Sequence, residues 1–124
     1  MLTVERVVPA PTPAVWDVLV DVEAWPEWGP SISGAELGAR GEKLELGSVG
    51  HVTTAIGLTL PFVITEFDDG RHWAWKVAGV SATRHRVQPA GEGCRVIFEV
   101  PWWAPPYLAV CAVALRRIEA MVAR

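Results

Sequence analysis

The sequence predicts an α+β domain in which helices pack on one face of an antiparallel sheet. Three observations support this class: a first strand followed by two short proline-marked helices, a glycine-punctuated series of β-prone runs, and a long apolar helix at the C-terminal end. The 124 residues suit one domain, residues 1–124, that is large enough to bury a core.

The N-terminal segment predicts one strand and two short helices. Residues 2–8 alternate well enough between apolar and polar side chains for a strand. Thr12 before Pro13 is typical of an N-cap followed by a proline at the first helical position, which predicts a short helix over residues 14–20. Residues 21–30, DVEAWPEWGP, predict a second short helix that is broken by its internal proline.

The middle of the chain predicts six or so antiparallel strands. From Ser31 onward, glycines separate short β-prone runs, as between successive strands. The clearest strands are predicted over residues 62–67, 72–78, 82–88 and 94–100.

The last stretch, PWWAPPYLAVCAVALRRIEAMVAR (residues 101–124), predicts one long helix. Prolines at 105 and 106 suit a first helical turn, where an N–H would be unpaired anyway. A single helical face collects Leu108, Cys111, Leu115, Ile118 and Val122. A helix this apolar at its start needs a broad, concave surface to receive it.

Composition and charge exclude several classes of function. The net charge is −3 and no basic stripe is present, which argues against nucleic acid as a partner. Prolines interrupt the apolar run near the C-terminus, and its uninterrupted part is far shorter than the roughly 20 residues of a membrane span. We therefore expect no stable membrane insertion. The N-terminal residues do not resemble a signal peptide, which indicates a cytoplasmic protein.

Neither a metal nor a cofactor is expected from the sequence. Cys94 and Cys111 lack metal or redox spacing, so we expect two buried free thiols. The three histidines, at 51, 72 and 85, lack the close pairing of zinc ligands on one element. A glycine-rich phosphate loop and a nucleophile motif are also missing from the sequence.

Three stretches carry a resemblance to a known family: PTPAVWDVLVDVEAWPEWGPSI, FVITEFDDGRHWAWKVAG and ATRHRVQPAGEGCRVIFEV. They resemble the polyketide cyclase/dehydrase group of the START-like superfamily, and the resemblance covers nearly the whole chain. It implies the helix-grip fold, in which a curved antiparallel sheet of about seven strands wraps around the C-terminal helix, with two short helices after the first strand. The resemblance also implies an apolar cavity between the sheet and that helix.

Alternation along the strands predicts which side chains face the cavity. The predicted outer face carries charges that we expect to form cross-strand pairs: Glu5, Lys76, Arg84, Arg86, Arg95 and Glu99. The predicted inner face is largely apolar. Together with the C-terminal helix and its entry, it supplies the candidate ligand-binding residues, which are Arg6, Trp73, Trp75, Thr83, Phe98, Trp102, Leu108, Cys111 and Leu115.

Several of these residues have two interpretations. His85 is either a core histidine satisfied by hydrogen bonds or an acid–base group that acts on a ligand. Trp73 and Trp75 either fill the core or stack on a ligand. Arg6, if it points inward, needs a partner such as a ligand carboxylate or Glu66. The tryptophans at 102 and 103 are expected to gate one end of the cavity.

Three functions follow from this pattern. The favoured one is binding of a hydrophobic small molecule, such as a lipid, a polyketide or an aromatic compound, because the predicted inner surface is almost wholly apolar. The second is a cyclase, aromatase or dehydratase that uses His85 in the same cavity. The third is a packed domain whose apolar helix face forms a homodimer.

Overall fold

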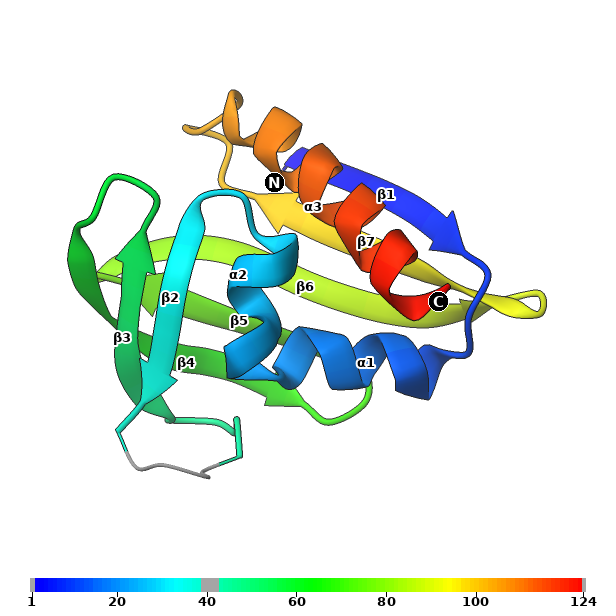
Figure 1. Cartoon of the computed structure of the whole chain (residues 1–124), viewed down its shortest axis with the longest axis horizontal. Coiled ribbons are helices and arrows are strands. Elements are labelled where there is room, and N and C mark those ends of the chain that lie inside the picture. The colour runs from blue at the N-terminus through cyan, green and yellow to red at the C-terminus, as the bar shows by residue number, and fades with distance from the viewer. Residues whose placement is uncertain (1, 39–42, 124) are drawn as a thin grey trace.

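The computed structural model describes residues 2–38 and 43–123 and confirms the α+β class. The elements, in chain order (Figure 1), are β1 (Leu2–Val8), α1 (Thr12–Val20), the 3₁₀ turn η1 (Val22–Ala24), α2 (Trp25–Trp28), β2 (Ile32–Leu37), β3 (Val49–Thr54), β4 (Thr59–Asp68), β5 (His72–Val77), β6 (Val80–Ala90), β7 (Gly93–Val100) and α3 (Tyr107–Val122).

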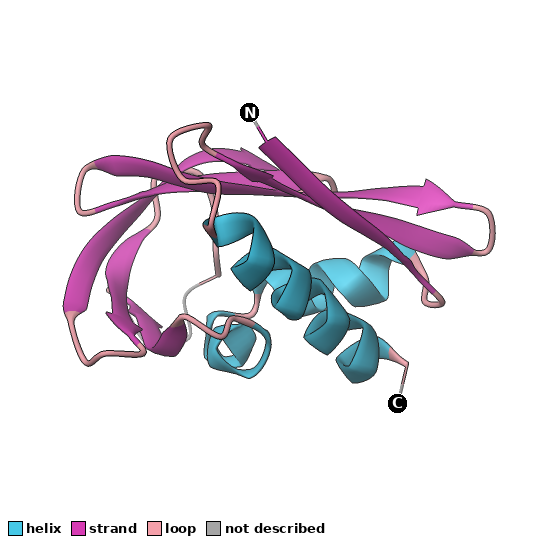
Figure 2. Ribbon diagram, turned by 90° about the horizontal axis from the view of Figure 1, so that it is seen from above, coloured by secondary structure: helices cyan, strands magenta, loops and turns pink. Residues whose placement is uncertain are grey.

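All seven strands belong to one antiparallel sheet with the order β1-β7-β6-β5-β4-β3-β2. The two strands nearest the N-terminus therefore lie at opposite edges. The sheet is curved, and the helices lie on its concave side (Figure 2). Residue pairing shifts between Ile64 and Glu66 of β4 and between Ala74 and Lys76 of β5, and such bulges bend strands. This is the helix-grip arrangement.

The first helix begins differently from the sequence-based prediction. Thr12 is the first residue of α1, not its N-cap; the cap position is held by Pro11, without a side-chain hydrogen bond. The extended backbone of Pro11 aims its carbonyl oxygen at the N–H of Ala14, 3.0 Å away, and at that of Val15. The backbone carbonyl therefore takes the place of the predicted hydroxyl cap.

The second and last helices are shorter than predicted. Residues 21–30 divide into η1 and α2, and Pro26 lies in the first turn of α2, where a missing N–H breaks no helical bond. The last helix begins at Tyr107, because the three prolines before it leave residues 101–106 in successive turns. Of the described residues, no helix is long and apolar enough to span a membrane.

Aromatic rings fill the core between the sheet and the helices. Trp25 stacks on Trp73 with ring centroids 5.0 Å apart, and Trp73 stacks on His85 at 4.0 Å. The indole N–H of Trp25 donates to the carbonyl oxygen of Leu19 at 2.9 Å. The indole N–H of Trp73 is buried and meets no acceptor within the described parts of the chain. Most tryptophans therefore act as core residues.

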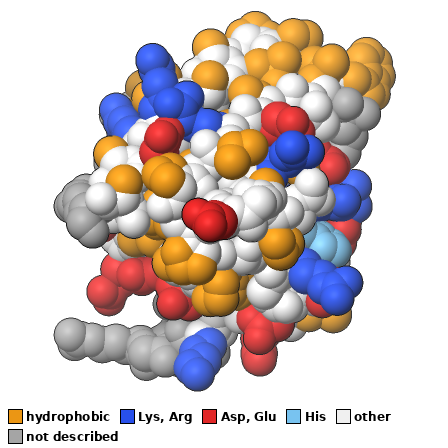
Figure 3. All heavy atoms as spheres, turned by 90° about the vertical axis from the view of Figure 1, so that its right-hand side faces the viewer, with side chains coloured by type: hydrophobic (Ala, Val, Ile, Leu, Met, Phe, Trp, Pro, Cys, Tyr) orange, Lys and Arg blue, Asp and Glu red, His pale blue; other side chains and the backbone are white. Residues whose placement is uncertain are grey.

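The outer face confirms the expected cross-strand ion pairs for five of the predicted residues, which are Glu5, Arg84, Arg86, Arg95 and Glu99. Arg84 donates to Glu66 at 2.6 Å and lies 3.5 Å from Glu99, and Arg86 lies 3.8 Å from Glu99. Glu66 is thus on this face and not on the inner one. Figure 3 shows acidic and basic side chains next to one another, whereas hydrophobic side chains gather at its upper end, where Figure 1 shows the β7–α3 linker.

Candidate ligand-binding pocket

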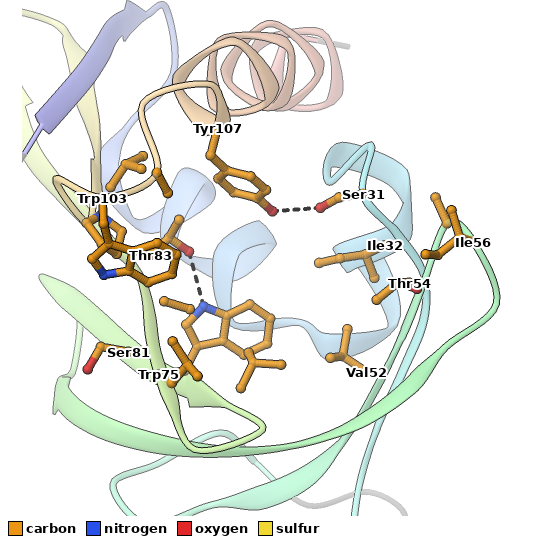
Figure 4. A pocket seen from close by; sticks show the side chains of 17 residues that line it. Ser31, Ile32, Val52, Thr54, Ile56, Trp75, Ser81, Thr83, Trp103 and Tyr107 are labelled. Atoms are coloured by element: carbon orange, nitrogen blue, oxygen red, sulfur yellow. Dashed lines mark hydrogen bonds between the residues drawn. The ribbon is translucent and has the colours of Figure 1, made fainter.

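A pocket with a volume of about 480 Å³ opens where α3 begins (Figure 4). Its walls come from β3, β5, β6, the β3–β4 turn, the start of β2 with the loop before it, and the segment from the end of β7 to the start of α3. The side chains of Tyr107 and Trp75 point into the space from opposite sides. The apolar lining residues include Ile32, Val52, Ile56, Val77, Val80, Val100 and Trp103.

No charged side chain lines this pocket among the residues that the structure describes. The charges of β4, β6 and β7 lie on the other face of the sheet, where they pair with one another. The β3–β4 turn and the β7–α3 linker contain no charged residue at all. The pocket is therefore suited to uncharged, apolar surface.

A tight hairpin forms the pocket wall made by β5 and β6. Val77 pairs with Val80, which leaves a two-residue turn in which Ala78 and Gly79 both have positive φ, 51° and 78°. Two positive φ values are typical of the type I′ turn, whose twist suits a hairpin. Beyond this turn the pairing shifts between Ala74 and Lys76, and this bulge places Trp75 beside Thr83, so that their side chains form a hydrogen bond on the inner face.

A chain of hydrogen bonds runs along the floor of the pocket. The indole N–H of Trp75 donates to Thr83 Oγ1 at 3.1 Å, and Thr83 Oγ1 lies 3.0 Å from His85 Nε2. His85 Nδ1 lies 3.4 Å from the carbonyl oxygen of Trp73. Burial lowers the pKa of His85 to about 3, so its ring is neutral at physiological pH.

A second polar pair lies on the opposite wall. The hydroxyl oxygens of Ser31 and Tyr107 are 2.6 Å apart and share a hydrogen bond. Burial raises the pKa of the Tyr107 phenol, which therefore keeps its proton at neutral pH. This bond ties the first residue of α3 to the loop before β2.

A smaller cavity of about 20 Å³ adjoins the inner end of the pocket, beneath α3. Ser31, Ile32, Trp75, Thr83 and Tyr107 line both spaces. The smaller cavity is about large enough for one water molecule. The aromatic core and α3 close it from behind.

The whole chain matches one protein family. A family model described as polyketide cyclase / dehydrase and lipid transport matches residues 1–124. The chain belongs to this family. The resemblance stated from the sequence is thereby confirmed.

Solved structures of similar fold include bacterial proteins and a protein from a biosynthetic locus. Protein NE0264 from Nitrosomonas europaea is 18% identical with a TM-score of 0.70, covering 97% of this chain and 92% of that one. Protein MLL2253 from Mesorhizobium loti is 12% identical with a TM-score of 0.76, covering 99% and 96%. DynU16, from the dynemicin biosynthetic locus, is 16% identical with a TM-score of 0.70, covering 96% of this chain and 45% of that one. At these identities the similarity concerns the fold. No curated protein matches the chain.

Within this polyketide cyclase/dehydrase fold, the candidate residues divide into three groups. Trp75 and Thr83 line the larger pocket. Those lining only the smaller cavity are Trp73, His85, Phe98 and Cys111. Those lining neither are Arg6, Trp102, Leu108 and Leu115.

The contacts and exposure of the third group explain why these residues lie away from both cavities. Arg6 lies on edge strand β1 and forms an ion pair with Glu119 of α3, neither with Glu66 nor at the pocket. Trp102 is 76% exposed, whereas its neighbour Trp103 lines the pocket. Leu115 is buried in the core. The apolar stripe of α3 therefore packs mainly on the core, and only the start of the helix meets the larger pocket.

The two thiols are buried and free, as expected. Burial raises the pKa of the Cys111 thiol to about 11. Over residues 2–38 and 43–123, no three histidine, cysteine or carboxylate side chains come together in a way that could hold a metal ion.

Sequence reasoning missed most of the pocket lining, Ser31 and Val52 included, and left the role of Tyr107 open. Ser31 precedes β2 and Val52 lies in β3, a region whose strands were only loosely assigned. Alternation along β3 carries a weak signal for Val52, because the neighbours of this buried residue are more exposed. The contact between Ser31 and Tyr107 joins residues 76 positions apart and leaves no local pattern.

Proposed function

We propose that this domain binds an uncharged hydrophobic small molecule in the pocket at the start of α3. The observation that carries the proposal is the lining: it is mostly apolar, and no charged side chain among the described residues faces it. The volume of about 480 Å³ falls in the range of small-molecule sites. A ligand that buries roughly 300 Å² of apolar surface would gain roughly 7 kcal/mol at about 25 cal/mol per Å².

The geometry of His85 favours binding over the cyclase alternative. Both ring nitrogens are engaged, one by Thr83 and the other by the Trp73 carbonyl. With a pKa of about 3, the ring is a poor base for proton transfer near neutral pH. A group of this kind supports the pocket floor and holds neighbouring side chains in place.

The test is titration with N-phenyl-1-naphthylamine, an uncharged fluorescent probe, followed by the same titration of a variant with a filled pocket. Val52 is buried and lines the pocket, whereas Val49, on the same strand, is 58% exposed and lies outside it. Val52→Phe should weaken probe binding at least tenfold, because the larger ring occupies ligand space. Val49→Phe should leave it unchanged.

Circular dichroism of both variants verifies that they are folded. Saturable binding by wild type that Val52→Phe abolishes supports the proposal. Absence of saturable binding by the wild type, or equal binding by folded Val52→Phe, would refute it. Native mass spectrometry of the freshly purified protein supplies a second readout, since a co-purifying apolar ligand adds a defined mass.

A further inference from the structure

The inner end of the pocket holds two separate polar units in otherwise apolar surroundings. One is the Ser31–Tyr107 hydroxyl pair, and the other is Thr83 with the indole N–H of Trp75 (Figure 4). All four residues line both the pocket and the small cavity behind it. A bound molecule that reaches the inner end must therefore meet both units or displace water from them.

The hydrogen bonds of Thr83 leave it able only to accept. The Trp73 carbonyl can only accept, so the proton of neutral His85 is on Nδ1 and its Nε2 is an acceptor. The Thr83 hydroxyl must then donate its single proton to that Nε2. Oγ1 also accepts from the Trp75 indole, which uses one of its two lone pairs. The remaining lone pair is suited to an O–H or N–H donor.

The Ser31–Tyr107 pair has the opposite property. Two hydroxyls bring two protons, and the bond between them uses one. Whichever oxygen donates, one hydroxyl proton stays available at the inner end. The Trp75 N–H is already engaged by Thr83, so this pair supplies the available proton among the polar groups that line both spaces.

We propose that the ligand is an uncharged, mainly hydrocarbon molecule bearing two kinds of oxygen or nitrogen group: an O–H or N–H that donates to Thr83, and a carbonyl-type oxygen that accepts from the Ser31–Tyr107 pair. This inference rests on the proposed function and names its ligand class. A plain hydrocarbon would dehydrate both units without replacing their hydrogen bonds, which lowers its affinity. A carboxylate would find no cation in the described pocket lining.

The test uses two pairs of uncharged naphthalene probes that differ in one property each. 2-Naphthol and 2-methoxynaphthalene differ in the donated proton, and 2-acetylnaphthalene and 2-isopropenylnaphthalene differ in the accepting oxygen. Each probe carries one polar group and can orient freely. Isothermal titration calorimetry on the wild type should show a roughly five- to tenfold preference for the first member of each pair, the usual effect of one hydrogen bond.

Two variants should remove these preferences separately. Thr83→Val should abolish the preference for naphthol and keep the preference for the acetyl probe, whereas Thr83→Ser should keep both. Ser31→Ala combined with Tyr107→Phe should abolish the acetyl preference and keep that for naphthol. The matched control is Ser33→Ala, because Ser33 does not line the pocket and its hydroxyl donates to the backbone carbonyls of Thr53 and Thr54. Both preferences should survive it.

Each outcome decides the inference. Wild type that binds all four probes without preference overturns it and leaves the proposed function standing. Loss of both preferences in one folded variant also overturns it, since the hydroxyls would then only shape the pocket. If none of the probes binds, the proposed function fails as well. If Thr83→Val does not fold, the wild-type preferences and the Ser31/Tyr107 double variant still decide.

Discussion

The buried histidine predicts how the stability of the protein depends on pH. His85 is 3% exposed and its folded-state pKa is about 3, lowered by burial from an ordinary value of 6.5. Below pH 6.5 the unfolded chain binds a proton at this residue, and the folded protein does not until the pH approaches 3. Protonation therefore favours unfolding, so His85 makes the protein less stable as the pH falls through this window.

The magnitude follows from the size of the window. Each pH unit between the two pKa values changes the free energy of unfolding by about 1.4 kcal/mol. Between about pH 6.5 and 4.5 the wild type should lose roughly 2–3 kcal/mol through this residue alone. Other groups add their own dependence, so the difference between wild type and a variant is the quantity to measure.

Urea unfolding at several pH values between 7 and 4.5 measures this difference. His85→Gln cannot titrate and should lower stability at pH 7 while flattening its decline toward acid. The control, His51→Gln, removes an exposed histidine and should retain the wild-type slope. An equal slope for wild type and His85→Gln would contradict the assignment of a neutral, buried imidazole.

Three further changes test the packing. Gly50→Ala should lower the free energy of unfolding, measured in urea, by about 1–3 kcal/mol, because the added Cβ would overlap a carbonyl oxygen of β2 and the ring of Phe62. The control is Gly34→Ala, where no neighbour lies closer than 3.9 Å, and this change should lower the free energy of unfolding much less. Trp25→Phe should cost about 1 kcal/mol more than Trp73→Phe, because only Trp25 uses its indole N–H in a hydrogen bond; equal losses would contradict this. Cys111 is buried and its thiol has a pKa of about 11, so it should react with a thiol reagent only when the protein unfolds. The rate of labelling, measured at increasing urea concentrations, tests this. Rapid labelling of the native protein would contradict the burial of Cys111.

Patterns within single strands and hairpins made much of the fold predictable. In β7 the side chains at 94, 96, 98 and 100 are buried and those between them are more exposed, as alternation predicted. The same reasoning placed Trp73, Trp75, Thr83 and His85 inside. Local geometry decides these features, so the sequence is sufficient to predict them.

The pocket was harder to predict because its walls come from distant segments. Alternation shows that His85 faces inward, but not that Thr83 and the Trp73 carbonyl occupy both ring nitrogens. Periodicity identified the stripe of α3, but the prolines before Tyr107 shift the start of the helix and move the open space to that end. These features depend on how separate elements meet, which no local pattern encodes.

The strand order of the sheet has a consequence for the order in which the strands can pair during folding. Strands β2 to β7 each lie beside the strand that precedes or follows them in sequence, so they can pair soon after synthesis. β1 is different: its partner is β7, with Leu2 opposite Val100, and α3 packs against both strands. β1 is therefore made before β7 and cannot pair until β7 has been synthesised. We expect folding to begin among β2 to β7 and to finish only when β1 pairs with β7, a long-range step of the kind that slows β-rich proteins.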